Sequence, residues 1–283
     1  MPEKDDLLKG LFLDKPELVI GLSEKILPAD MIEVYRSIPG LAIVEMAGRD
    51  SVAAAIKAVE QKGFTDLLPT YAYTGTEYGP WLSVIRAVER LAERLPDTNV
   101  HDLLVMGSPA FWQALNGRFV SDLITRYGCF TPCVGCHLYL HSVRIPLAKA
   151  LGNVPVISGE RESHDGIVKI NQVKKTLDRY QYVAKHFEIP VLFPLRKVQQ
   201  GSQIEKILGF DWAEGREQLG CVLSGNYRHR DKSPAITEKD VLPFLDEYAV
   251  PCTIKIIETY LSGDVPDHTN IAGRILTNLN KTE

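Results

Sequence analysis

Short apolar runs alternate with amphipathic segments along this chain from about residue 41 onward. The run LAIVEM at 41–46 predicts a buried strand, and the spacing of apolar positions predicts a helix over 51–62 that Gly63 ends. The same reading predicts, in chain order, a strand at 66–75, helix at 79–95, strand at 101–107, helix at 109–128, helix at 136–152, strand at 154–159, helix at 171–187 and strand at 189–195.

This alternation predicts an α/β fold of the Rossmann-like type, with a mostly parallel sheet and helices on both of its faces. We expect residues 1–40 to form a helical segment in front of the domain and residues 41–225 to form the domain itself. Residues 226–283 are expected to be a C-terminal extension packed on the same domain, and the segment 250–261 within it fits a strand or a helix. In sheets of this kind, ligands bind beyond the carboxyl ends of the strands.

Composition and charge narrow the class of protein. The 283 residues are 45% hydrophobic and 24% charged, which is enough apolar material for a core, and the net charge of −4 gives no overall basic surface for nucleic acid. No apolar run approaches the roughly 20 residues that span a bilayer, and the first residues carry no signal-peptide pattern. We therefore expect a cytoplasmic protein without a membrane partner, in which clustered cysteines bind metal or perform redox chemistry.

A turn of small residues joins the first predicted strand to the helix after it. In EMAGRDSVAAA, Gly48 permits a close approach of the backbone, and Arg49, Asp50 and Ser51 are suited to contact phosphate or Mg²⁺. The N–H groups and the dipole at the start of a helix favour bound anions. An ordinary turn, with Asp50 or Ser51 capping the helix, accounts for the same residues.

Three of the five cysteines lie in the stretch RYGCFTPCVGCHLYLHSVR. Cys133 and Cys136 form a C-x-x-C before a predicted helix, a spacing at which two thiolates share one metal or cluster. One interpretation is a structural zinc, with Cys129, Cys133, Cys136 and either His137 or His141 as ligands. A thioredoxin-like redox pair is a second interpretation. The spacing C-x3-C-x2-C, which radical S-adenosylmethionine enzymes use, is a third.

The strand, turn and helix around AGRDS resemble the PP-loop of the ATP pyrophosphatases, which have the adenine nucleotide alpha hydrolase-like fold and the pattern S-G-G-x-D-S. Gly48, Asp50 and Ser51 match this pattern. Met46 and Ala47 replace its leading serine and first glycine. The resemblance implies that this turn holds the pyrophosphate of ATP together with Mg²⁺.

The order of this turn, the C-x-x-C and one distant cysteine resembles the iron–sulfur-dependent tRNA 2-thiolation enzymes. Cys221 lies 85 residues after Cys136, in EQLGCVLSGNY. The resemblance implies that Cys133, Cys136 and Cys221 hold a [4Fe–4S] cluster whose fourth iron is open to a sulfide, and thiolates are suitable ligands for such clusters. Cys252 has no neighbouring cysteines with which to form the terminal zinc ribbons of that family. We therefore expect a small, anionic molecule as the substrate, with tRNA as the alternative.

Charged residues near predicted strand ends extend the candidate site. The segment ISGERESHDG follows a predicted strand and contains Glu160, Arg161 and His164, of which Glu160 and Arg161 are suited to contact the nucleotide. His164 fits a proton-transfer role, because the ordinary pKa of histidine lies near neutrality. Arg144 is suited to contact an anionic substrate or the cluster. Further contacts to an anion are offered by a basic cluster after Cys221, namely Arg228, Arg230 and Lys232.

Thr74 and Glu77 follow the second predicted strand, where PP-loop enzymes hold adenine or the substrate. The resemblance as a whole implies a sulfur transferase in which ATP adenylates an oxygen of the substrate and sulfide from a sulfur donor then displaces AMP. We expect Asp50, Arg144 and His164 to take part in this catalysis. An ATP-independent, cluster-based desulfurase and a regulatory protein that binds nucleotide or cluster remain alternatives, as does assembly into a homodimer.

Overall fold

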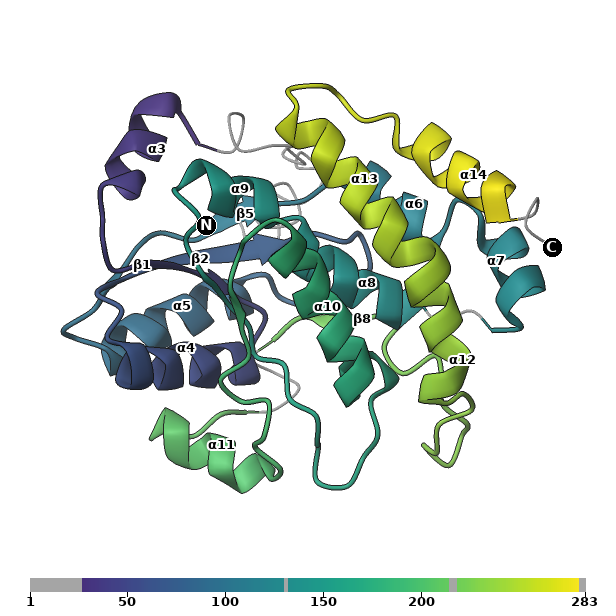
Figure 1. The fold of residues 1–283 in the computed structure, drawn as a ribbon. Helices are drawn as coiled ribbons and strands as arrows, with labels where there is room; N and C mark the ends of the chain where they lie inside the picture. Colours follow the sequence, from purple (N-terminus) through teal and green to yellow (C-terminus); the bar gives the residue numbers. More distant parts are fainter. Residues whose placement is uncertain (1–26, 130–131, 214–217, 280–283) are drawn as a thin grey trace, which may run out of the picture.

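The computed structural model describes residues 27–129, 132–213 and 218–279, and its centre is a parallel sheet between two layers of helices (Figure 1). Within these ranges the sheet consists of β4 (Asn99–Val100), β2 (Asp66–Ala72), β1 (Leu41–Glu45), β6 (Val156–Ile157) and β7 (Val191–Leu192) in this spatial order, with β5 (Leu104–Met106) also paired to β2. Every pairing in the sheet is parallel. The predicted α/β fold class is confirmed.

β1 lies at the centre of the sheet, and its alternating side chains enter two separate cores. Leu41 and Ile43 belong to one core, whereas Ala42 and Val44 belong to the other. The core that contains Ala42 is covered by α4 (Arg49–Lys62), α5 (Leu82–Arg94) and α11 (Gly201–Leu208). The core that contains Leu41 is covered by α6 (Pro109–Asn116), α8 (Pro132–Ser142), α10 (Lys174–His186) and α13 (Val250–Leu261).

Two segments that were predicted as single helices are each divided. The segment 109–128 contains α6 and α7 (Val120–Tyr127), because α6 ends at Asn116 and Gly117 follows as its C-cap. The segment 136–152 contains the end of α8 and the separate helix α9 (Ile145–Ala150). Pro146 has no N–H to donate to the carbonyl group of Ser142, so one helix cannot continue through it. The prediction of uninterrupted helices was wrong at these two points.

Helices precede and follow the sheet. The described part of the predicted N-terminal helical segment contains α3 (Ala29–Arg36), and its earlier part lies outside the described residues. The C-terminal part contains α12 (Glu238–Pro243), a π-helical segment η3 (Phe244–Ala249), α13 and α14 (His268–Leu279). The segment 250–261, which fitted a strand or a helix, is the helix α13, and it packs against α8 and α10 (Figure 1). None of the helices in the described ranges is both long and apolar enough to cross a membrane.

The topology opens a crevice beside β1. This strand pairs with β2 on one side and with β6 on the other, so the loops after β1 and β6 leave the sheet next to each other but lead in different directions. A second, antiparallel pairing joins β3 (Glu77–Tyr78) to β8 (Gly220–Cys221). Because β3 follows β2, this pairing brings the distant segment around β8 to the carboxyl end of the sheet.

Candidate functional site

Two adjoining cavities lie beyond the carboxyl ends of β1, β2 and β6. The larger has a volume of about 360 Å³ and the smaller a volume of about 190 Å³. Six residues line both cavities, namely Thr76, Cys136, His137, Lys169, Gln172 and Cys221. The two cavities are therefore neighbouring parts of one cleft.

The smaller cavity brings together the three cysteines that were predicted to be cluster ligands. Cys133 and Cys136 belong to the first turns of α8, and Cys221 ends β8. The Sγ atom of Cys133 lies 3.3 Å from the carbonyl oxygen of Leu223. Burial raises the pKa of the Cys136 thiol, and negative charge on Cys221 and Cys133 raises it further. Burial also raises the pKa of Cys133, so both groups are protonated thiols at neutral pH unless a bound metal stabilises the thiolate forms.

The other two cysteines lie apart from this cavity. The Sγ atom of Cys129 is 3.4 Å from the carbonyl oxygen of Asp240, and Cys252 is fully buried in α13. Neither lines the smaller cavity. The position of Cys129 argues against both the zinc and the radical S-adenosylmethionine interpretations, because each needs this thiol as a ligand. Three thiols without a fourth fit a [4Fe–4S] cluster that has one iron without a protein ligand.

The turn after β1 is closed by its own serine. The Oγ atom of Ser51 accepts hydrogen bonds from the N–H groups of Ala47 and Gly48, both at 3.0 Å, and donates to the carbonyl oxygen of Gly48 at 2.6 Å. Two N–H groups of the proposed anion site are thus used within the turn. A Cβ atom at Gly48 would lie 2.6 Å from the side-chain oxygen of Gln218, so glycine permits this close contact.

Asp50 is bound by two arginines at the start of α4. Its carboxylate oxygens lie 2.9 Å from Nε of Arg49 and 2.8 Å from Nε of Arg161. Burial by itself would raise the pKa of Asp50, but the two guanidinium groups outweigh burial and hold the pKa below its ordinary value. Arg161 is 2% exposed, and its Nη1 atom has no hydrogen-bond partner among the described residues. Guanidinium N–H groups are suited to bind anionic oxygens. Arg161 lines neither cavity, however, so its contact to a nucleotide stays a prediction.

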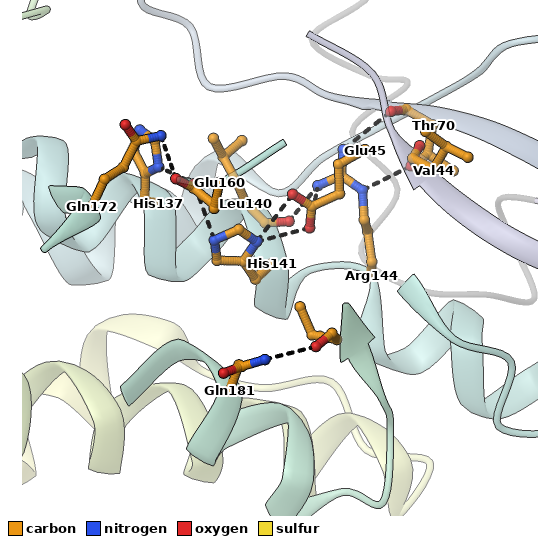
Figure 2. Close-up of polar contacts among 11 residues, drawn as sticks. Val44, Glu45, Thr70, His137, Leu140, His141, Arg144, Glu160, Gln172 and Gln181 are labelled. Carbon is orange, nitrogen blue, oxygen red and sulfur yellow. Dashed lines mark hydrogen bonds and ion pairs between the residues drawn. The ribbon is translucent and has the colours of Figure 1, made fainter. Parts of the chain in front are cut away.

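Two histidines and two glutamates, of which only His137 is not fully buried, form a connected chain beside the larger cavity (Figure 2). Nδ1 of His137 lies 2.6 Å from Oε1 of Glu160, and Nδ1 of His141 lies 2.9 and 3.0 Å from the two oxygens of Glu45. Burial alone would lower the pKa of His141, but Glu45 and Glu160 outweigh it and raise the pKa to about 9. Burial alone would raise the pKa of Glu160, but His137 and His141 hold it well below its ordinary range.

Arg144 lines the larger cavity, but the protein itself engages its guanidinium group (Figure 2). Nε donates to the hydroxyl group of Thr70 at 2.7 Å, Nη2 donates to the Thr70 carbonyl oxygen at 3.1 Å, and Nη1 donates to the carbonyl oxygen of Leu140. Nη1 also lies 3.7 Å from Glu45. Arg144 therefore holds β2, α8 and Glu45 together, and its contact to an anionic substrate stays a prediction.

His164 lies outside the lining of both cavities and is 4% exposed. Burial lowers its pKa to about 4, and the positive charges of Lys169 and Arg161 act in the same direction. This pKa lies well below the near-neutral value on which the proton-transfer role was based. Its participation in catalysis is thus left without the physical reason first given for it.

Two predicted contacts and one overlooked residue complete the lining of the cleft. Thr74 and Glu77 line the larger cavity, where a Glu77 oxygen accepts from the N–H and hydroxyl groups of Thr74 at 2.7 and 2.8 Å. Lys169 lines both cavities, and its ammonium group has no hydrogen bond or ion pair with other described residues. Burial lowers its pKa. Lys169 belongs to no motif, and only the meeting of distant segments identifies it.

Comparison with known proteins places the chain in a family. No family model matches it. The chain is 38% identical to the uncharacterized protein MJ0009 of Methanocaldococcus jannaschii over 240 residues. The aligned region covers 83% of this chain and 86% of that protein. The chain belongs to the same family as this archaeal protein.

Three solved structures resemble the chain at low identity. A 4-thiouridine synthetase–RNA complex with bound ATP has 16% identity and a TM-score of 0.45, over 84% of this chain and 53% of that one, so the chain spans about half of its length. The U34-tRNA thiolase NcsA from Methanococcus maripaludis, with its [4Fe–4S] cluster, has 13% identity and a TM-score of 0.40. This match covers 89% of the present chain and 78% of the thiolase chain. A predicted subunit of tRNA methyltransferase from Methanocaldococcus jannaschii has 12% identity and a TM-score of 0.36. This match covers 81% of the present chain and 90% of the subunit.

Proposed function

We propose that this protein is a sulfur-transferring enzyme in which Cys133, Cys136 and Cys221 hold a [4Fe–4S] cluster beside a phosphate-binding turn at residues 48–51. The observation that carries the proposal is the shared cleft: the cavity lined by all three cysteines adjoins the cavity lined by the turn. A cluster with three protein thiolates supplies one iron that can bind a sulfur atom.

Positive groups around the turn support the binding of ATP with Mg²⁺. Arg161 offers the unpaired Nη1 atom beside the start of α4, and Lys169 has no partner of its own within the described ranges. Asp50 supplies the carboxylate that a magnesium ion prefers. Both of its oxygens are paired with arginines in the structure, so a magnesium ion has to displace one of them.

The proposed thiolation exchanges an oxygen for a sulfur without a change of oxidation state. A carbonyl oxygen of the substrate accepts the adenylyl group of ATP, and pyrophosphate leaves. Hydrosulfide, which carries sulfur at the sulfide level, then bonds to the same carbon. The carbon–oxygen bond breaks, the oxygen leaves with AMP, and the proton of the hydrosulfide passes to solvent. Arg161 and Lys169 would balance the negative charge that develops on the departing pyrophosphate.

A small, anionic molecule is the substrate class that the cleft supports best. The larger cavity, at about 360 Å³, falls within the usual range for small-molecule sites. Lys169 lines both cavities and Arg228 lines the smaller one, so each part of the cleft offers a basic side chain to an anionic group, beside the carboxylates of the larger cavity. A tRNA would need several further phosphate contacts outside the cleft.

One observation favours an ATP-independent desulfurase as a second candidate. The N–H groups of Ala47 and Gly48 already bond to Ser51, and Gln218 lies against Gly48. Both arrangements leave less of the turn for a phosphate group. In this candidate reaction, water supplies the oxygen that replaces the sulfur of a thiocarbonyl group, and sulfide leaves, so neither ATP nor a redox partner is consumed.

Anaerobic purification followed by iron, sulfide and zinc analysis tests the cluster. We expect about four irons and four sulfides per chain. Single Cys133→Ala, Cys136→Ala and Cys221→Ala variants should lose the cluster, whereas the matched controls Cys129→Ala and Cys252→Ala should keep it. Stoichiometric zinc without iron, or a complete cluster in Cys221→Ala, would overturn the proposal.

A further inference from the structure

We propose that His137, His141 and Glu160 form a second metal site, separate from the three cysteines. One ligand atom from each of these residues lies within 4.8 Å of the other two. His137 and His141 are four residues apart on α8, so their rings lie on the same face of this helix. Glu160 follows β6 and reaches both rings (Figure 2).

One ring nitrogen of this group has only a long contact, which points to a missing ligand. His141 is 1% exposed, and its Nδ1 atom is held by Glu45. Its Nε2 atom has no hydrogen-bond partner among the described residues, although it lies 3.4 Å from Oε1 of Glu160. Nδ1 of His137 approaches the same oxygen at 2.6 Å. Two imidazole nitrogens thus converge on one carboxylate oxygen, and one of the two has no hydrogen bond there.

Neighbouring groups orient each proposed ligand. Glu45 binds Nδ1 of His141, and the side-chain amide of Asn171 lies 2.8 Å from Nε2 of His137. The second oxygen of Glu160 accepts from the side chain of Gln172. Metal-binding histidines are usually held in this way, with one ring nitrogen on the metal and the other on a carboxylate or amide group.

The donor set and the local charge indicate the class of metal. Two imidazoles and one carboxylate are the ligands of catalytic zinc sites, which keep a further position open. His137 and Glu160 line the larger cavity, whereas His141 lies behind them, so the open position would face the cavity. The carboxylates of Glu45 and Glu160 both contact the ring of His141, so a divalent cation bound here would lie next to negative charge.

Cobalt(II) binding to the full-length protein tests this site, because cobalt absorbs differently with sulfur ligands and with nitrogen and oxygen ligands. We expect the second site to bind one cobalt ion that shows ligand-field absorption without sulfur-to-cobalt charge transfer. Metal bound at the cysteines is counted separately. His137→Gln and Glu160→Gln should weaken the binding of this ion at least tenfold. His164→Gln is the matched control, because His164 is a buried histidine outside the group.

Two outcomes would overturn the inference: unchanged cobalt binding in both variants, or cobalt bound through sulfur alone. Glu160→Gln keeps the shape of a buried side chain, and His137→Gln changes a side chain that is 25% exposed, so at least one folded variant is expected. Cys133→Ala should lose the cluster and keep the second ion. This difference separates a failure of the second site from a failure of the proposed sulfur chemistry.

Discussion

The hydroxyl group of Thr76 lies 3.2 Å from the thiol of Cys221, although 145 residues separate them in the sequence. The contact adjoins the antiparallel pairing of β3 with β8, in which Glu77 lies opposite Cys221. The Thr76 hydroxyl also lies 2.8 Å from the hydroxyl of Thr74, which bonds to Glu77. One hydrogen-bonded turn therefore connects a proposed nucleotide contact to a proposed cluster ligand.

Thr76→Val should change the reduction potential of the cluster without changing its iron content. The variant keeps all three cysteines and the approximate size of residue 76. Loss of a hydrogen bond to the Cys221 sulfur disfavours the more negative, reduced cluster, so we expect a more negative potential. A redox titration measures this shift, with Thr125→Val on α7 as the control. An unchanged potential would show that this hydroxyl does not act on the cluster.

Asp50→Ala should separate magnesium binding from phosphate binding. A ligand present at 100 times its dissociation constant stabilises a folded protein by about 2.7 kcal/mol, which raises its melting temperature. We expect the variant to lose the additional stabilisation that Mg²⁺ gives to bound ATP. The shift caused by pyrophosphate alone should persist, because Arg161 no longer has to bind Asp50. Equal loss with and without Mg²⁺ would contradict this assignment.

Lys169→Met should stabilise the protein and weaken its binding of pyrophosphate. Removal of a partly buried ammonium group that has no partner among the described residues should raise the free energy of unfolding by about 1 kcal/mol. The same change removes a positive charge from both cavities. Urea unfolding with and without pyrophosphate measures both effects. Lys197→Met is the control, since Lys197 is exposed and paired with Glu162. A less stable variant, or one with an undiminished pyrophosphate shift, would refute this role.

His268→Gln should reduce the loss of stability in mild acid. Burial lowers the pKa of His268 to about 4, from an ordinary value of 6.5. Protons therefore bind the unfolded chain first, and stability falls as the pH decreases from 6.5 toward about 4. Allowing for partial exposure, we expect the variant to avoid about 1 kcal/mol of the loss between pH 7 and pH 5.

Urea unfolding of His268→Gln at the two pH values measures this difference. Tyr260→Phe is the matched control, because it removes the hydroxyl that lies 3.1 Å from Nε2 of His268 and keeps the titrating ring. This control should retain the acid-induced loss. The same decline in His268→Gln as in the parent protein would assign the acid sensitivity to other groups.

Local sequence patterns were sufficient to predict most of the fold. The apolar run at β1 predicted a buried strand, and all residues of β1 are buried. Gly63 ends α4 in the left-handed conformation that glycine readily adopts. The errors arose where one residue interrupts an otherwise helical pattern, at Gly117 and at Pro146. The segment 250–261 could not be assigned from its pattern, because it is apolar enough for either structure until its packing on α8 and α10 is known.

By itself, the sequence identified the groups whose chemistry is carried by short-range spacing. Cys133 with Cys136 is such a pair, and so is the turn at residues 48–51, because the atoms concerned lie within a few residues of one another. The tertiary structure alone decided which distant groups meet. It placed Cys221 beside Thr76, surrounded Arg144 with Thr70 and Leu140, and left the ammonium group of Lys169 without a partner among the described residues. The physical reason is that burial, pairing and charge depend on contacts between segments far apart in the chain, which no local pattern contains.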